Sequence, residues 1–143
     1  MAKRVLVTER IADEGLEALE RRGLEVDVRL DLTPEQLIEV IPPYDAIIVR
    51  SATRMTPEVI DAAANLKIIG RAGVTVDNIN VDAATAKGII VCNAPTSNIV
   101  SAAEHTMALL LAAARRIPQA IASMHGGEWD RASFVGSELL GKT

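Results

Sequence analysis

Aromatic residues and cysteine are scarce in this chain of 143 residues. With one Trp, one Tyr and one Phe, the core is expected to consist of Ala, Val, Ile and Leu, and nucleic-acid binding by aromatic stacking is disfavoured. Cys92 is the only cysteine, which excludes an internal disulfide, and no spacing typical of metal ligands accompanies it. We therefore expect a reducing, cytoplasmic location and no metal site.

Basic blocks and long apolar runs are also missing. The formal net charge is -4, without a cluster of Lys and Arg, which argues against a polyanion as partner. The N-terminal stretch MAKRVLVTER lacks the apolar segment of a signal peptide. The longest apolar run, residues 107–114, is far shorter than the ~20 residues of a membrane-spanning helix. Neither nucleic acid nor membrane is expected as a partner.

What the sequence does contain is a regular alternation of short β-branched runs and helical runs. Two helical runs begin with Thr33-Pro34 and Thr56-Pro57, which is typical of an N-cap followed by the first helical residue, and Asn80 is the expected cap of a third. Five strands are expected, at residues 4–8, 24–28, 46–49, 67–70 and 89–93. This order predicts an α/β fold: a doubly wound parallel sheet in residues 1–97, covered on both faces, with Cys92 in its core.

A longer apolar helix is expected from Ser101 to about Arg116, because Ser101 and Glu104 have the spacing of a capping box. Only three residues between positions 102 and 114 are polar, so the helix should be buried on more than one side. The preceding domain alone cannot cover it. We expect residues 98–143 to need a second domain, a second subunit, or both.

Arginine follows two of the predicted strands at equivalent places. Arg50-Ser51 comes after one strand, and Arg71-Ala72-Gly73 after the next. Ligands of open parallel sheets bind beyond the carboxyl ends of the strands, where a guanidinium group suits a carboxylate or phosphate and glycine allows close approach of the backbone. The pattern favours an anion site shared by both arginines. The alternative, in which each arginine points into water or pairs with a nearby acid, stays open.

Four longer stretches carry a family resemblance: VRSATR, GRAGVTVDNINVDAATAKGIIVCNAPTSN, SAAEHTMALLLAAARRIPQA and EWDRASFVGSELLGKT. Together they resemble the NAD-dependent D-2-hydroxyacid dehydrogenase family. The motifs RSAT, NAPTSN and GKT resemble those of the branch that oxidises 3-phosphoglycerate to 3-phosphohydroxypyruvate in serine biosynthesis. The resemblance implies a flavodoxin-like substrate domain in residues 1–97, then an interdomain and dimerisation helix leading into a truncated Rossmann domain in residues 98–143.

The resemblance also implies roles for individual residues. Arg50 and Ser51 would bind the anionic groups of a phosphorylated hydroxy acid, and Arg71 with the backbone of Gly73 would do the same near the nicotinamide. The family usually has glycine where this chain has Thr75, and a β-branched residue disfavours a positive φ there.

Three further implications concern the cofactor and the assembly. Val74 and Thr106 would contact NAD, and Arg131 would reach the site of a neighbouring subunit in a homodimer or homotetramer. The family's catalytic arginine, glutamate and histidine are expected beyond Thr143, so the chain alone should be inactive. Two alternatives stay open: a relative acting on another D-2-hydroxyacid such as glycerate or lactate, and a stand-alone flavodoxin-like module that binds a small anion.

Overall fold

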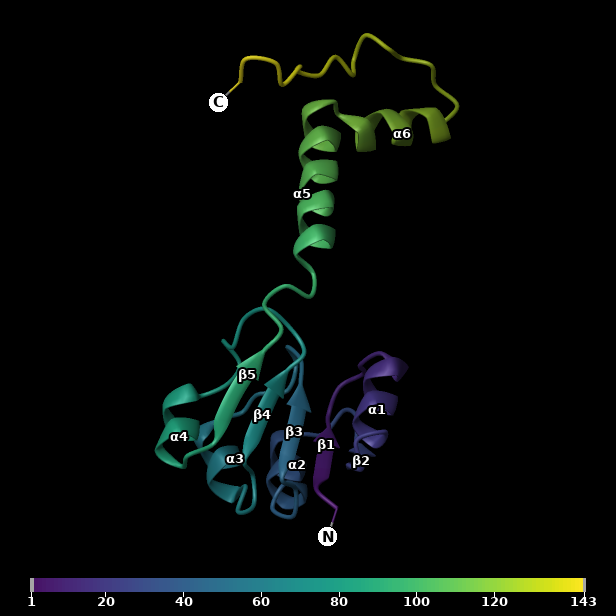
Figure 1. Cartoon of the computed structure of the whole chain (residues 1–143). Coiled ribbons are helices and arrows are strands. Elements are labelled where there is room, and N and C mark those ends of the chain that lie inside the picture. Colours follow the sequence, from purple (N-terminus) through teal and green to yellow (C-terminus); the bar gives the residue numbers. More distant parts are fainter. Residues whose placement is uncertain (1, 143) are drawn as a thin grey trace. The chain divides into compact units, whose positions relative to one another are not determined.

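The computed structural model describes residues 2–142, which form two compact units divided between Ser97 and Asn98 (Figure 1). The described part of the first unit contains five strands and four helices. The described part of the second contains two helices and a tail.

The first unit is built on a sheet of five parallel strands in the order β2-β1-β3-β4-β5. This is the strand order of flavodoxin-like folds. The strands are β1 (Arg4–Val7), β2 (Glu25–Val28), β3 (Ala46–Val49), β4 (Ile68–Arg71) and β5 (Ile90–Asn93). The predicted α/β fold with a parallel sheet is confirmed. One boundary matters for the site: Arg71 is the last residue of β4 rather than the first residue after it.

Four helices connect these strands: α1 (Asp13–Glu20), α2 (Pro34–Val40), α3 (Pro57–Ala62) and α4 (Val81–Ala86). The predicted caps of α2, α3 and α4 are confirmed. The hydroxyl of Thr33 accepts from the Gln36 N–H at 3.3 Å while the Gln36 side chain accepts from the Thr33 N–H at 2.9 Å, which completes a capping box. Thr56 and Asn80 also accept from backbone N–H groups at the starts of α3 and α4. Local sequence therefore determines where α2, α3 and α4 begin.

The core lies between the sheet and helices α2, α3 and α4. Leu6, Ile47 and Ile69 are fully buried on this face, at matching register positions of β1, β3 and β4. They belong to one apolar cluster with residues of the three helices, which include Leu37, Ile60 and Ala84. Most of this core consists of the aliphatic residues expected from the composition, and Tyr44 and Met55, each 1% exposed, are also part of it.

The opposite face of the sheet is covered only in part by the described residues. Helix α1 packs along β2 on this side, and an apolar hollow of about 360 Å³ separates it from β4 and β5. Ile90 is 63% exposed and the Cys92 thiol is exposed. The expectation that both faces would be covered, with Cys92 in the core, is therefore wrong for β5. The reason is that α1 is the only described helix on this face and does not extend over β5.

The second unit begins with α5 (Ile99–Ala114) and α6 (Ile117–His125). The predicted start at Ser101 is wrong: Asn98 is the N-cap, and its carbonyl accepts from the Ala102 N–H at 2.9 Å, closing the first turn earlier. Neither Ser101 nor Asn98 provides a side-chain cap. The chain turns sharply at Arg116, which has φ 53° and donates to the Ser133 carbonyl of the tail at 3.1 Å.

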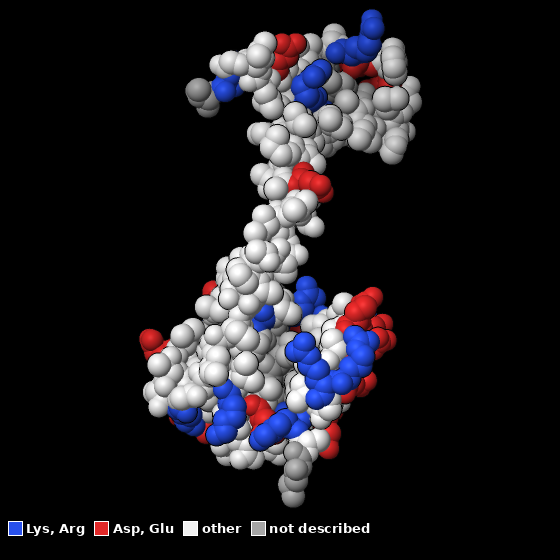
Figure 2. Space-filling model, in the orientation of Figure 1, with Lys and Arg blue, Asp and Glu red and all other residues white. Residues whose placement is uncertain are grey.

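Helix α5 is apolar nearly all round, and its side chains are exposed. Leu109, Leu110 and Leu111 are 57%, 47% and 45% exposed. Figure 2 shows acidic and basic side chains interspersed over the first unit, whereas the surface of α5 is almost uncharged. Within residues 2–142, no helix has both the length and the hydropathy to cross a membrane. A contiguous apolar surface of this kind is typical of interaction sites.

Candidate functional site

The candidate site lies where β1, β3 and β4 end side by side. In the order β2-β1-β3-β4-β5 the chain leaves β1 toward one edge of the sheet and β3 toward the other, so the carboxyl ends of β1 and β3 form the topological switch point. Arg50 follows β3, and Arg71 pairs in register with Val49 at the end of β3. The sheet therefore brings both predicted arginines to one edge, as the strand pattern indicated.

The loop of residues 50–53 is held by a carboxylate that sequence reasoning missed. Glu9, just after β1, accepts hydrogen bonds from the backbone N–H groups of Arg50 at 2.7 Å, Thr53 at 2.9 Å and Ala52 at 3.1 Å. Partial burial raises the pKa of Glu9, but the bonds from this loop outweigh burial and bring that pKa below its ordinary value. Its place directly after the neighbouring strand was the available signal.

Asn78 binds the same loop through two of the loop's backbone carbonyl groups. Its side-chain amide donates to the Arg50 carbonyl at 2.7 Å and to the Thr53 carbonyl at 2.6 Å. Its side-chain oxygen accepts from Arg71 Nε at 2.7 Å. Asn78 was not among the residues that the sequence analysis predicted for the site. In the structure it connects the loop after β3 to the arginine at the end of β4.

The Arg71 side chain is nearly buried, and Gly73 leaves the space that its guanidinium group occupies. The Arg71 side chain is 9% exposed, with Nη2 3.7 Å from the carboxylate of Asp77. A Cβ at position 73 would lie 2.7 Å from Arg71 Nη1 and 3.3 Å from Cζ, so any larger residue there would require the guanidinium group to shift. The Gly73 N–H donates to the Arg71 carbonyl at 2.9 Å. Gly73 thus shapes the seat of Arg71, while its own N–H is engaged within the loop.

Arg50 and Ser51 are exposed, and Arg50 takes a different direction from Arg71. Arg50 Nη1 donates to the Arg10 carbonyl at 3.2 Å, toward the loop after β1. The 360 Å³ hollow that Arg71 lines is not lined by Arg50. The two arginines share an edge of the sheet and the Asn78 link, but the structure does not show their guanidinium groups converging in one cavity.

The segment after Gly73 is tied to the end of β5. The Val74 carbonyl accepts from the side-chain amide of Asn93, and Val74 itself is 37% exposed. The Thr75 hydroxyl donates to Asp77. Thr75 does not have a positive φ, so its β-branched side chain fits the backbone without the conflict expected from the sequence.

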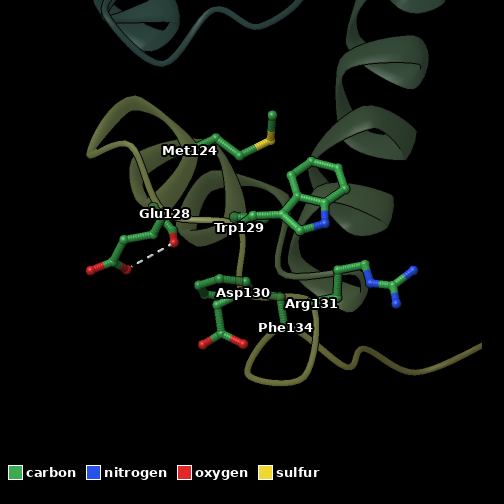
Figure 3. Close-up of a pocket in the computed structure, with 8 residues that line it drawn as sticks. Met124, Glu128, Trp129, Asp130, Arg131 and Phe134 are labelled. Atoms are coloured by element: carbon green, nitrogen blue, oxygen red, sulfur yellow. Dashed lines mark hydrogen bonds between the residues drawn. The ribbon is translucent and has the colours of Figure 1, made fainter.

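The remaining predicted residues lie in the second unit. The Thr106 hydroxyl donates to the Ala102 carbonyl within α5 at 2.7 Å. Arg131 lines a hollow of about 250 Å³ beside α6, together with Trp129 and Phe134 (Figure 3). Trp129 is 75% exposed. Each unit therefore carries part of the predicted set, and the residues of the first unit form the connected group.

This arrangement can bind an anion at the sheet edge. Arg71 presents a charge-assisted donor in a desolvated seat, where a charge interacts more strongly than it does in water. Arg50 and Ser51 add an exposed guanidinium group and hydroxyl on the neighbouring loop. These groups suit binding and orientation of a carboxylate or phosphate.

Comparison with known proteins identifies the family of the chain. Residues 5–138 match the family model "D-isomer specific 2-hydroxyacid dehydrogenase, catalytic domain". The chain is 55% identical over 140 residues to the D-3-phosphoglycerate dehydrogenase of Archaeoglobus fulgidus, covering 98% of this chain and 27% of that protein. It thus spans about a quarter of that relative's length.

Two solved structures share the fold of this chain. The TT0316 protein from Thermus thermophilus superposes with a TM-score of 0.85 at 35% identity, covering 95% of this chain and 45% of that one. The NAD+-bound 3-phosphoglycerate dehydrogenase of Entamoeba histolytica gives a TM-score of 0.77 at 28% identity, covering 97% and 44%.

Proposed function

The chain belongs to the D-isomer specific 2-hydroxyacid dehydrogenase family, and from this premise we propose that it is the N-terminal, substrate-binding portion of a D-3-phosphoglycerate dehydrogenase. The complete protein would oxidise 3-phosphoglycerate to 3-phosphohydroxypyruvate, a step of serine biosynthesis. The observation that carries the proposal is the pair of arginines at the ends of neighbouring strands, beside the switch point of the sheet. The named relative at 55% identity supports the substrate.

The described residues fit substrate binding better than cofactor binding. Arg50, Ser51 and Arg71 would hold the anionic groups of the acid and fix its orientation. NAD, when bound, would take the hydride from the substrate carbon. Exposed Val74 stands at the same edge of the sheet and could contact it, and we assign the same role to Thr106. The sequence contains no Gly-rich dinucleotide loop, so the main NAD contacts would come from the rest of a longer protein.

The test is turnover by the full-length encoded protein. We expect NAD reduction with 3-phosphoglycerate to be faster than with glycerate or lactate. Arg50→Ala should remove most of the preference for the phosphorylated acid, whereas Arg22→Ala, a matched change in the exposed turn after α1, should leave it intact. Equal turnover of phosphorylated and unphosphorylated acids would instead favour a relative with another hydroxy acid as substrate.

The second unit supports a proposal about assembly. The exposed leucines of α5 and the exposed Trp129 would be covered by a second copy of the chain in a homodimer or homotetramer, with Arg131 reaching the partner's site. Light scattering on the purified chain tests this. A stable monomer that binds a small anion at micromolar concentration would favour the stand-alone binding module.

A further inference from the structure

The loop of residues 50–53 is held from both sides by groups outside it. Glu9 accepts from three of its backbone N–H groups, and Asn78 donates to two of its carbonyls. Thr8, which is 3% exposed, adds a hydroxyl contact to Thr53 at 2.9 Å. Six hydrogen bonds from three positions therefore fix a segment of four residues.

We call Glu9, Asn78 and Thr8 the clamp of this loop. Their hydrogen bonds determine which polar groups of the loop remain available to a ligand. Glu9 engages the N–H groups of Arg50, Ala52 and Thr53. Among the described residues, the Ser51 N–H has no acceptor, and the Ser51 side chain is exposed. The groups left for a ligand are thus the N–H and hydroxyl of Ser51 and the guanidinium group of Arg50.

Asn78 extends the clamp to the second arginine. Its side-chain oxygen accepts from Arg71 Nε while its amide nitrogen donates to the Arg50 carbonyl. Its backbone carbonyl accepts from the Met55 N–H at 2.9 Å, which anchors it to the segment after the loop. The amide of one residue thereby sets the spacing between the two arginine-bearing segments.

We propose that Glu9 and Asn78 are positioning residues for the substrate-binding loop 50–53: they do not contact the hydroxy acid, but they hold Arg50 and Ser51 at the spacing from Arg71 that the acid requires. This inference rests on the proposed function, since it assigns the acid to that edge of the sheet. Misplacement of binding groups by about 1 Å costs on the order of 100-fold in an enzyme, which sets the scale of the expected effect.

Two variants of the full-length protein test the clamp separately. Glu9→Gln keeps the size of the side chain and removes its charge. Asn78→Asp keeps an acceptor for Arg71 Nε and removes the donors to the Arg50 and Thr53 carbonyls. Glu20→Gln, at the exposed end of α1 and without a side-chain hydrogen bond or ion pair to any described residue, is the matched control.

Steady-state kinetics with 3-phosphoglycerate give the first readout. We expect Glu9→Gln and Asn78→Asp to raise the KM for the acid by roughly 10-fold or more, with kcat changed by less than about 3-fold and the KM for NAD unchanged. Glu20→Gln should match the wild type in all three. An unchanged KM for the acid, with only a lower thermal midpoint, would show a purely structural role and overturn the proposal.

Amide hydrogen exchange of the peptide covering residues 50–53 gives a readout independent of turnover. It should be faster in Glu9→Gln than in Glu20→Gln, and equal exchange would overturn the clamp. If the wild-type protein oxidises no hydroxy acid, the proposed function fails by itself. The comparison of exchange with and without inorganic phosphate then decides whether the loop is held for an anion: phosphate should slow exchange in the wild type and not in Glu9→Gln, and the absence of any difference refutes it.

Discussion

Replacement of Gly73 by alanine should weaken binding of the acid strongly while lowering the stability of the fold only moderately. Gly73 does not have a positive φ, so alanine suits the backbone there. The added Cβ would lie 2.7 Å from Arg71 Nη1, whereas ordinary contact begins at 3.4 Å, so the guanidinium group must move by about 0.7 Å (3.4 − 2.7). Arg71 Nε is held at 2.7 Å by Asn78, and a shift of that size weakens this bond.

The expected change in stability combines the loss of the Arg71–Asn78 hydrogen bond with the gain from replacing glycine by alanine. Losing a hydrogen bond to a charged group costs about 1.5–3 kcal/mol, whereas Gly-to-Ala at a compatible position gains about 0.4–1 kcal/mol through the unfolded chain. The net loss of stability is then about 0.5–2.6 kcal/mol. For the ligand, misplacing Arg71 should raise the KM for the acid about 10- to 100-fold.

The assay combines thermal unfolding with steady-state kinetics on the full-length protein. Gly15→Ala is the control, because its Cβ would meet only the tip of Ile11 at an ordinary 3.6 Å inside helix α1. That variant should be more stable by about 1 kcal/mol and bind the acid normally. An unchanged KM in Gly73→Ala would refute the reasoning that this glycine exists to seat Arg71.

Three further predictions concern stability. Tyr44→Phe removes the hydroxyl that donates to Asp27, and urea denaturation should show a loss of about 1 kcal/mol. Gly136→Ala places a Cβ well inside contact distance of the Ala114 carbonyl oxygen, so we expect a loss of stability of about 1–3 kcal/mol and faster proteolysis of the tail. A tail as resistant as in the wild type would contradict the close approach. The lowered pKa of Glu9 adds stability that is fully present above its ordinary value of 4.5 and is lost as pH falls through the lower value of the folded protein. Acid titration of Glu9→Gln should therefore show a smaller loss of stability in that range than the wild type.

Much of the first unit could be predicted from sequence because its signals are local. The Thr-Pro pairs at Thr33 and Thr56 act within one helical turn, and the β-branched runs mark the strands. The start of α5 could not be predicted in the same way. Ser101 and Glu104 have the spacing of a capping box, but helical geometry begins earlier, at Ile99, and Ser101 lies inside the helix.

Only those residues of the candidate site that directly follow a predicted strand could be found from the sequence. Arg50 and Arg71 could be found because each follows an apolar run, and the parallel sheet places such ends together. Glu9 and Asn78 act across 41 and 28 residues of sequence on the Arg50 segment, and their roles depend on strand order. Cys92 was misplaced because a β-branched strand indicates burial without saying whether a helix covers each face.

The scarcity of aromatic side chains gives each unit its own optical reporter. Tyr44, the only tyrosine, is 1% exposed in the core of the first unit, and Trp129, the only tryptophan, is 75% exposed in the second. Indole emission in the isolated chain should therefore shift to shorter wavelength when another copy covers Trp129, while the near-ultraviolet dichroism of the tyrosine follows melting of the sheet. Association and unfolding can thus be measured in one sample without a label.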